Sequence, residues 1–248
     1  MTAEVSPERV TELADRLIAV RARIDAACVA ADRAPGSVEL LAVTKTVPAA
    51  DVAALIDLGL TAFGENRVQE AGAKVAEVAE LRPTARPRWH VVGGVQRNKA
   101  KAVVRWADRV ESVDSVRLAG ALDTAVRRAL DTGERESVLP VLLQYSVDGD
   151  TARGGVPRVD LLALAEHVAG CAGLRLEGLM AVAPLHGIDT GSAFADIAAA
   201  AAELRAEHPG ARVLSAGMSG DLDVAIRHGS DVVRVGTALV GERRLTSR

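Results

Sequence analysis

The chain has 248 residues, 49% of them hydrophobic and 25% charged, an ordinary globular composition that can bury a large core. Its formal net charge of −3 is not accompanied by clustered basic residues, so we expect no nucleic-acid partner. No stretch approaches the roughly 18 uninterrupted apolar residues of a membrane span, and residues 1–8 lack the apolar segment of a signal peptide, so we expect a cytoplasmic protein without membrane contact.

The N-terminal region is predicted to form a long helix. Ser6 suits the N-cap, Pro7 suits the first helical position, and apolar residues follow at helical spacing up to Cys28. The other cysteine, Cys171, lies far away in the sequence, and neither has the spacing of a metal ligand. We therefore expect two reduced, small apolar side chains and no metal site.

From residue 38 onward, short apolar strand candidates alternate with helical patterns. The predicted strands cover residues 38–43, 61–63, 88–92, 109–113, 138–145, 174–180, 212–214 and 232–235. The predicted helices between them cover residues 49–58, 66–81, 98–106, 116–130, 159–168, 192–206 and 219–227. Such alternation favours parallel strands joined by crossover helices. Eight repeats fit a closed (β/α)₈ barrel of about 250 residues.

We therefore predict an α/β fold with one domain, residues 1–248, formed by a single TIM barrel with an extra N-terminal helix. An open doubly wound sheet is the alternative, but no G-x-G-x-x-G motif follows the first strand. No Pro-, Gly- or Ser-rich linker divides the chain. Residues 147–155 are polar enough for a βα loop but too short for a linker.

Lys45 follows the first predicted strand, where a βα loop begins. At the mouth of a barrel its ammonium would be partly desolvated, which lowers the pKa and suits a lysine to Schiff-base chemistry. The alternative is a lysine that extends from the strand end and pairs with a neighbouring carboxylate. The residue by itself does not decide between them.

The last two strands are followed by loops suited to an anion. Ser219 lies in a Gly-rich segment after the seventh strand, and Gly236 with Thr237 follows the eighth. In TIM barrels phosphate commonly binds at these two loops, and glycine lets the backbone approach an anion closely. The alternatives are that Ser219 caps the next helix and that Gly236 forms a tight turn.

Arg234 lies inside the last predicted strand, where a charge needs a specific partner. It would either form a buried ion pair, with Glu65 or Asp221 for example, or contact a ligand at the barrel mouth. His90 lies in an apolar strand and is interpreted as a core histidine with its hydrogen bonds satisfied.

Several segments together resemble one family, over residues 6–242. They include Leu41–Lys45, Phe63–Glu70, His90–Lys99, Ser112–Ser115, Gly178–Met180, Met218–Asp221 and Val233–Ala238, in this order. This series resembles the pyridoxal phosphate homeostasis protein family, whose barrel is similar to the N-terminal domain of alanine racemase. Each segment is common by itself, and their order and spacing make the match specific.

The resemblance implies that pyridoxal 5′-phosphate (PLP) is held as an aldimine on Lys45. It also implies that Arg234 faces the pyridine nitrogen and that Asn66 and Met218 line the cofactor. Ser219, Gly236 and Thr237 would bind the phosphate. The chain departs from the family pattern at Glu111, where the family usually has histidine, in residues 92–96, and after strand five, where Asp150 and Arg153 stand in a changed loop.

The favoured function is a PLP carrier or buffer that serves intracellular PLP homeostasis, with PLP-dependent apoenzymes as partners; we expect a monomer with little or no turnover and no catalytic residue. The alternative is a PLP-dependent racemase or decarboxylase. A racemase needs a second acid–base group opposite the lysine, and the single tyrosine of this chain, Tyr145, lies on strand five. A cation at Arg234 would also weaken the electron sink of PLP. A cofactor-free phosphosugar-binding barrel is a third hypothesis.

Overall fold

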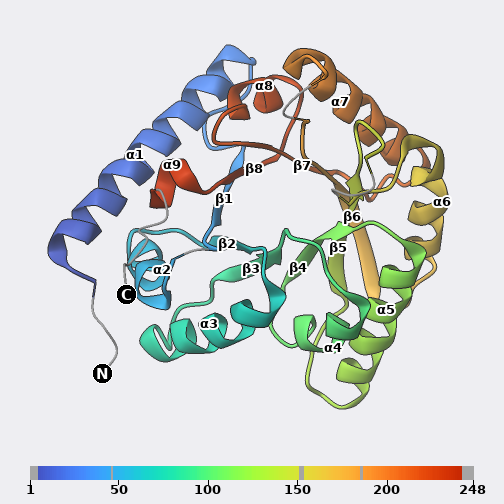
Figure 1. Ribbon diagram of the computed structural model, residues 1–248, viewed down its shortest axis with the longest axis horizontal. Helices are drawn as coiled ribbons and strands as arrows, with labels where there is room; N and C mark the ends of the chain where they lie inside the picture. Colours follow the sequence, from blue (N-terminus) through green and yellow to red (C-terminus); the bar gives the residue numbers. More distant parts are fainter. Residues whose placement is uncertain (1–4, 46, 151–153, 185–186, 242–248) are drawn as a thin grey trace.

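Eight parallel strands close into a barrel and follow one another around it in chain order (Figure 1). The computed structural model of the protein describes residues 5–45, 47–150, 154–184 and 187–241. The strands are β1 (Glu39–Val43), β2 (Ala62–Glu65), β3 (Arg88–Val91), β4 (Arg109–Val113), β5 (Leu139–Tyr145), β6 (Leu174–Ala181), β7 (Val213–Met218) and β8 (Val232–Val235). The predicted barrel is confirmed.

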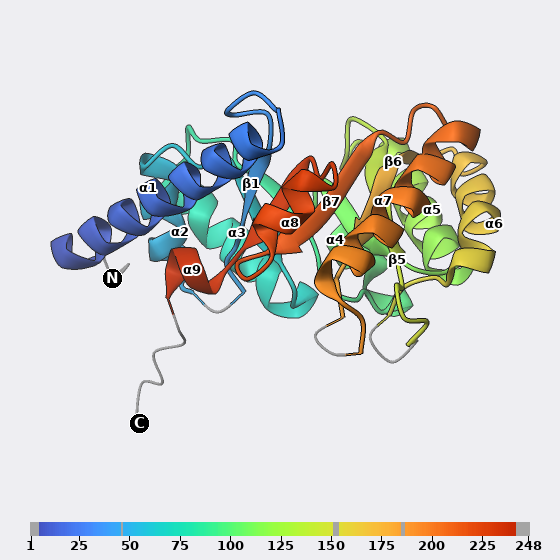
Figure 2. The same cartoon turned by 90° about the horizontal axis from the view of Figure 1, so that it is seen from above.

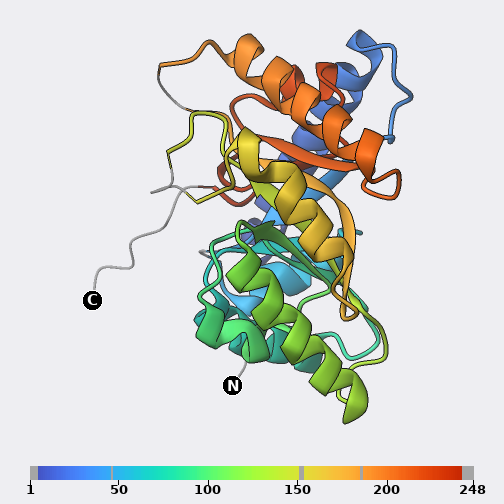
Figure 3. The ribbon, with the colours of Figure 1, turned by 90° about the vertical axis from the view of Figure 1, so that its right-hand side faces the viewer.

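Helices surround the barrel. They are α1 (Pro7–Ala30), α2 (Ala49–Asp57), α3 (Val68–Leu81), the 3₁₀ helix η1 (Arg97–Lys99), α4 (Ala100–Val103), α5 (Val116–Asp131), α6 (Arg158–Ala169), α7 (Thr190–Glu207), α8 (Leu222–Arg227) and α9 (Thr237–Val240). Figure 3 shows α5, α6 and α7 covering the outside of the β5–β7 side. Within the described ranges, no helix has both the length and the apolar character needed to cross a membrane.

The strands are buried on both faces, as expected for a parallel sheet enclosed by helices. Every residue of β2 and of β8 is buried. On the outside of the barrel, β5 and β6 pack under α6, and β7 and β8 pack under α8. A charged residue on such a strand is therefore confined to the interior or to the ends of the barrel, which restricts where Arg234 can act.

Helix α1 is the predicted extra helix and lies outside the barrel next to α8 and α9 (Figure 2). Ser6 is its N-cap and accepts a hydrogen bond from the backbone N–H of Arg9 over 3.3 Å. Its buried face includes Leu13, Leu17 and Ile24. The helix thus packs against the two elements that follow β7 and β8.

Two predicted boundaries are wrong near the end of the chain. Strand β7 runs to Met218 instead of ending at Leu214, and α8 begins at Leu222 rather than at Ser219. Small residues such as Ser215 resemble a loop in the sequence, but in the barrel the Ser215 side chain is fully buried and hydrogen bonded. The predicted helix over residues 98–106 is reduced to η1 and the single turn of α4.

Gly178 marks the closest backbone approach between β6 and β7. A Cβ atom built at this position would lie 1.8 Å from the carbonyl oxygen of Val213. The register between β5 and β6 also shifts here, between Val141 and Leu142. No side chain fits at this position unless the barrel wall moves.

We predict that Gly178→Ala destabilises the protein by roughly 1–3 kcal/mol or more, because the added methyl group forces β6 and β7 apart in a packed barrel wall. Thermal and denaturant unfolding measure the change. The matched control is Gly120→Ala in α5, where nothing lies within 4 Å of the added Cβ. There we expect a gain of about 0.5–1 kcal/mol from the lower entropy of the unfolded chain. Equal stabilities of the two variants would contradict this account.

Candidate functional site

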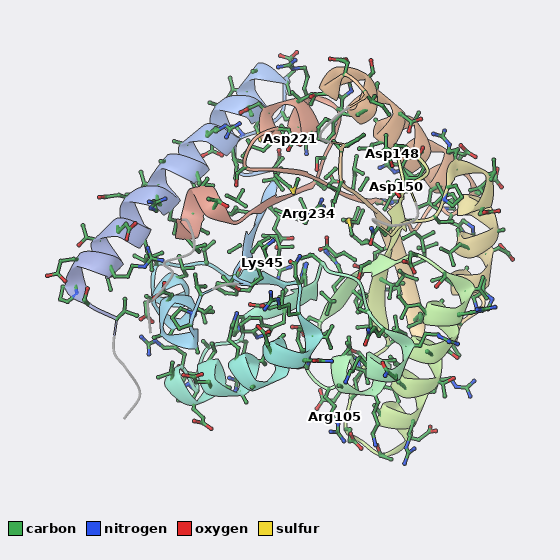
Figure 4. All side chains as sticks on the ribbon, viewed as in Figure 1. Lys45, Arg105, Asp148, Asp150, Asp221 and Arg234 are labelled. Atoms are coloured by element: carbon green, nitrogen blue, oxygen red, sulfur yellow. The ribbon has the colours of Figure 1, made fainter. Side chains whose placement is uncertain are left out.

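A cavity of about 540 Å³ opens at the carboxyl ends of the strands, the end where TIM-barrel sites lie. It is lined by Val43, Lys45, Asn66, Val92, Val182, Met218, Ser219, Gly220, Arg234, Gly236, Thr237, Val240 and Gly241. All seven residues that the sequence marked for a cofactor are in this set. Figure 4 shows Lys45 and Arg234 near the axis of the barrel, next to β1 and β8.

Lys45 lies two residues beyond the end of β1, in a turn. Its side chain lines the cavity and is exposed, and its partial desolvation stays a prediction. The residue before it is fixed by a buried network. The Thr44 hydroxyl donates to Oε1 of Glu65 over 2.7 Å, and Nζ of Lys74 donates to the same oxygen over 2.8 Å and to the Thr44 carbonyl over 2.7 Å. An exposed amine therefore extends from a base held by hydrogen bonds.

Asn66 directly follows β2 and is held from the side by Gly93. A Cβ on Gly93 would lie 2.4 Å from the carbonyl oxygen of Asn66, so the two backbones touch. The Ser112 hydroxyl donates to the Gly93 carbonyl over 2.7 Å and fixes that contact. Asn66 does not cap α3, because the N-cap of that helix is Arg67 and no side chain caps it.

The end of β7 depends on Gly217, the next-to-last residue of the strand. Its φ is +93°, and a Cβ there would lie 2.5 Å from the Cβ of Ala225, so both conformation and space require glycine. The Met218 N–H donates to Oδ1 of Asp221 over 2.6 Å, which closes the turn. Ser219 is not a helix cap, since α8 begins after Asp221 and has no side-chain cap.

Two arginines of α1 hold the loop after β7 and the helix after β8 from behind. Nη1 of Arg23 donates to the Ser219 carbonyl over 2.5 Å, while the same guanidinium pairs with Asp223. Nη2 of Arg9 donates over 2.8 Å to the carbonyl of Val240, the last residue of α9. Because these bonds engage carbonyl groups on the α1 side, they fix the backbone of the loop and of α9.

The N–H groups of these loops are available to a ligand. None of the hydrogen bonds within the described ranges uses the backbone N–H of Ser219, Gly220 or Gly236. Thr237 is the first residue of α9, and its N–H has no intrahelical acceptor. A Cβ on Gly236 would make only ordinary contacts with Val43, 3.5 Å away, so packing does not require glycine there. Adjacent free amides and hydroxyls suit an anion such as phosphate.

Arg234 is 5% exposed and forms the floor of the cavity. Its Nη1 donates to the Ser215 carbonyl over 2.6 Å and to the Ser215 hydroxyl over 2.8 Å, and its Nη2 donates to the Ala181 carbonyl over 2.7 Å. Neither Glu65 nor Asp221 forms the suggested ion pair. The carboxylate connected to Arg234 is Glu111, which accepts a hydrogen bond from the Ser215 hydroxyl over 2.6 Å.

Glu111 is fully buried and also accepts a hydrogen bond from Nδ1 of His90 over 2.7 Å. Burial favours the neutral acid, but the hydrogen bond and charge of His90, the charge of Arg234 and the hydrogen bond from Ser215 outweigh it and hold the pKa of Glu111 below its ordinary value. For Arg234 burial also favours the neutral form, which for a guanidinium lowers the pKa. The negative charges of Glu111 and Asp221 oppose that effect.

Tyr145 points away from the cavity. Its hydroxyl donates to Oδ2 of Asp196 on α7 over 2.6 Å, and it is absent from the residues that line the cavity. Burial, together with the hydrogen bond and charge of Asp196, raises the pKa of Tyr145 to about 12. The single tyrosine of the chain is therefore not placed opposite Lys45.

The sequence argument missed the apolar part of the cavity wall. Val43, Val92, Val182 and Val240 line it together with the two glycines Gly220 and Gly241. Each valine lies just at or after the end of a strand or helix, and a valine in that place carries no chemical signal. Gly220 could have been predicted to line the cavity, because it lies between Ser219 and Asp221 in the Gly-rich segment named above. Arg153, one of the departures noted above, lies outside the described residues.

Comparison with known proteins decides the family. A family model described as the N-terminal domain of alanine racemase matches residues 17–244. The pyridoxal phosphate homeostasis protein of Mycobacterium tuberculosis is 47% identical, and the match covers 100% of both chains. The protein of that name from Escherichia coli K12 is 36% identical over 94% of this chain and 98% of its own. This chain belongs to the pyridoxal phosphate homeostasis protein family.

Solved structures of similar proteins agree with the family assignment. PipY of Synechococcus elongatus, solved with PLP bound, is 35% identical with a TM-score of 0.76, over 92% of this chain and 100% of its own. An unknown protein from Bifidobacterium adolescentis is 33% identical with a TM-score of 0.84, over 96% and 98%. Alanine racemase of Corynebacterium glutamicum is 13% identical to this chain with a TM-score of 0.67, and the two proteins share the fold.

We predict that Tyr145 ionises with a pKa of about 12, well above the ordinary value of 10.0. Because the chain has a single tyrosine, the tyrosinate absorbance reports this residue alone. The raised pKa adds stability that is fully present below the unfolded pKa near 10 and is lost as the pH rises through 12. Denatured protein is the control and should titrate near 10. Coincident titration curves of native and denatured protein would contradict the Asp196 contact.

Proposed function

We propose that this protein binds PLP, holds it as a Schiff base on Lys45, and acts in PLP homeostasis as a carrier or buffer with little or no turnover. The observation that carries the proposal is the convergence of the seven marked residues, which come from the ends of four strands, on one cavity. The PLP in the PipY structure and the names of the relatives support it.

The cavity fits the parts of PLP. Its volume of about 540 Å³ is within the roughly 300–1,000 Å³ of small-molecule sites. The amine of Lys45 would take the aldehyde, and Ser219, Gly236 and Thr237 with their N–H groups would hold the phosphate. Asn66 and Met218 would lie along the ring, and Arg234 would face its nitrogen. When bound, PLP supplies a reactive carbonyl and an electron-withdrawing ring.

Two features of the cavity support low turnover. Among its described lining residues, Lys45 and Arg234 are the charged side chains, and no Asp, Glu, His, Cys or Tyr accompanies them. A second acid–base group, which a racemase needs on the opposite face, is therefore missing from this set. A cationic guanidinium at the ring nitrogen also disfavours its protonation and weakens the electron sink.

The exposure of Lys45 supports a carrier. An amine at an open rim can be reached by water or by an incoming amine, so a covalently held aldehyde can be released as well as retained. We propose that PLP-dependent apoenzymes are the recipients and that the protein acts as a monomer. The rigid base formed by Thr44, Glu65 and Lys74 keeps the amine over the cavity during exchange.

We predict that borohydride reduction of the PLP-loaded protein followed by peptide mapping places the pyridoxyl group on Lys45. In Lys45→Ala we expect no reducible adduct but residual PLP binding, because the phosphate contacts come from other strands. Equilibrium dialysis measures the PLP affinity that remains in this variant. A pyridoxyl group on another lysine, or unchanged affinity in Lys45→Ala, would overturn the assignment.

We further predict that the PLP-loaded protein exchanges the α-proton of a single-enantiomer amino acid in deuterium oxide only to about the amount of protein present. The expected limit follows from the missing second acid–base group. NMR of the amino acid measures the exchange, and an authentic racemase serves as positive control. Sustained turnover with loss of enantiomeric purity would favour the racemase alternative instead.

A further inference from the structure

Four polar side chains form a connected chain inside the barrel, below the cavity. His90, Glu111, Ser215 and Arg234 are each at most 5% exposed. They come from β3, β4, β7 and β8, so the chain crosses the barrel from one wall to the other. In the hydrogen bonds described above, Glu111 occupies the centre, with His90 on one oxygen and Ser215 on the other.

The donors in this chain have one consistent arrangement. A carboxylate only accepts, so the Ser215 hydroxyl and Nδ1 of His90 each present a hydrogen to Glu111. With its hydrogen committed to Glu111, the Ser215 oxygen turns a lone pair toward Nη1 of Arg234. Glu111 thereby sets the orientation of a hydroxyl that in turn fixes the guanidinium.

Arg234 keeps donors for a ligand. The three hydrogen bonds that the described residues accept from it use three of the five N–H groups of a guanidinium, which leaves two. Because Arg234 also lines the cavity, remaining donors are available at its floor. Their direction is fixed by the bonds to Ser215 and Ala181 on the other side of the group.

The charges in the chain also matter. A buried guanidinium without a counter-charge costs several kcal/mol, and Glu111 is the buried carboxylate connected to it through one hydroxyl. Glu111 thereby offsets part of the charge of Arg234. The guanidinium still has free donors, which suit the lone pair of a ring nitrogen, and its remaining positive charge disfavours protonation of that nitrogen.

We propose that Glu111 is a positioning residue of the cofactor site: through Ser215 it holds Arg234 in place and offsets its charge, so that the site selects an aromatic ring with an unprotonated nitrogen at its edge. This inference rests on the proposed function, because it assigns the ring-binding half of the same cavity. Phosphate is recognised by separate loops, so the two halves can be tested separately.

The test measures affinities of the full-length protein for PLP and for inorganic phosphate by calorimetry, together with the absorption spectrum of bound PLP. Glu111→Gln keeps the length of the side chain and removes its charge, and its carboxamide can still accept from Ser215. Glu111→Asp keeps the negative charge but shortens the side chain by one methylene, which moves the carboxylate away from Ser215 and His90. Circular dichroism and thermal melting of the ligand-free proteins show that each variant folds.

Two other variants are matched controls. Glu177→Gln removes a carboxylate from another ion pair of the barrel, with Arg109 at 2.6 Å, that does not line the cavity. Thr237→Ala removes a hydroxyl from the phosphate side. We expect Glu177→Gln to change neither affinity and Thr237→Ala to weaken both ligands in parallel.

For Glu111→Gln we expect PLP affinity to fall by about tenfold or more, the scale of a disturbed hydrogen bond to a charged group, while phosphate affinity does not fall. We also expect the absorption band of bound PLP to shift, because the charge below the ring has changed. Glu111→Asp should shift the band less. If Glu111→Gln does not fold, Ser215→Ala, which leaves all three charged or titratable partners in place, should give the same selective loss.

The outcomes separate the two claims. Wild-type protein that does not bind PLP would overturn the proposed function together with this inference. Wild-type binding with Glu111→Gln indistinguishable from Glu177→Gln, in affinity and in spectrum, would overturn the inference alone. Parallel loss of PLP and phosphate affinity in Glu111→Gln would also overturn it, because a general structural effect would then suffice.

Discussion

The site depends on one physical constraint: a guanidinium is buried in the middle of a parallel barrel. An arginine on a fully buried strand must find acceptors and a counter-charge, or the strand cannot remain there. Arg234 finds two carbonyls and a hydroxyl, and the hydroxyl leads to Glu111. The positions of Ser215, Glu111 and His90 follow from this requirement. The floor of the cavity is therefore one connected polar layer.

The walls of the cavity combine held backbone with one exposed side chain. The backbone after β7 and β8 is held by a required glycine at 217, by the Asp221 carboxylate and by arginines of α1. Beside β8, Lys45 extends as an exposed side chain from a base fixed by hydrogen bonds. Such a division suits a site that grips one end of a ligand firmly and binds the other end reversibly.

Much of the barrel, and many of the residues that line its cavity, could be predicted from the sequence. Alternating apolar runs and amphipathic helices predicted the closed barrel. Strand ends pointed to Lys45, Ser219 and Thr237, because polar residues at the carboxyl ends of parallel strands converge, and the family resemblance pointed to Asn66. The partner of Arg234 could not be predicted. Glu111 is far from it in sequence, and only the barrel's closure and register bring β4 opposite β7 and β8.

Local resemblance to loops caused the other errors. The segment after Leu214 contains small and glycine residues, and local propensity does not reveal that Ser215 is held in a strand by two charged partners. The apolar cavity wall carried no signal because valine is equally common in any buried strand.

Under the proposed function, the arginines of α1 give a helix that is remote from the barrel axis a share in ligand binding. Arg23 bonds to a carbonyl of the loop after β7 and Arg9 to the carbonyl of the last residue of α9, so the positions of the free amides are partly set from outside the barrel. Selection for tighter or looser retention of the ligand can therefore act on the amino-terminal helix without altering any group that touches the ligand. Inherited or engineered changes in retention would then appear far from the cavity, in residues that no inspection of the pocket alone would single out.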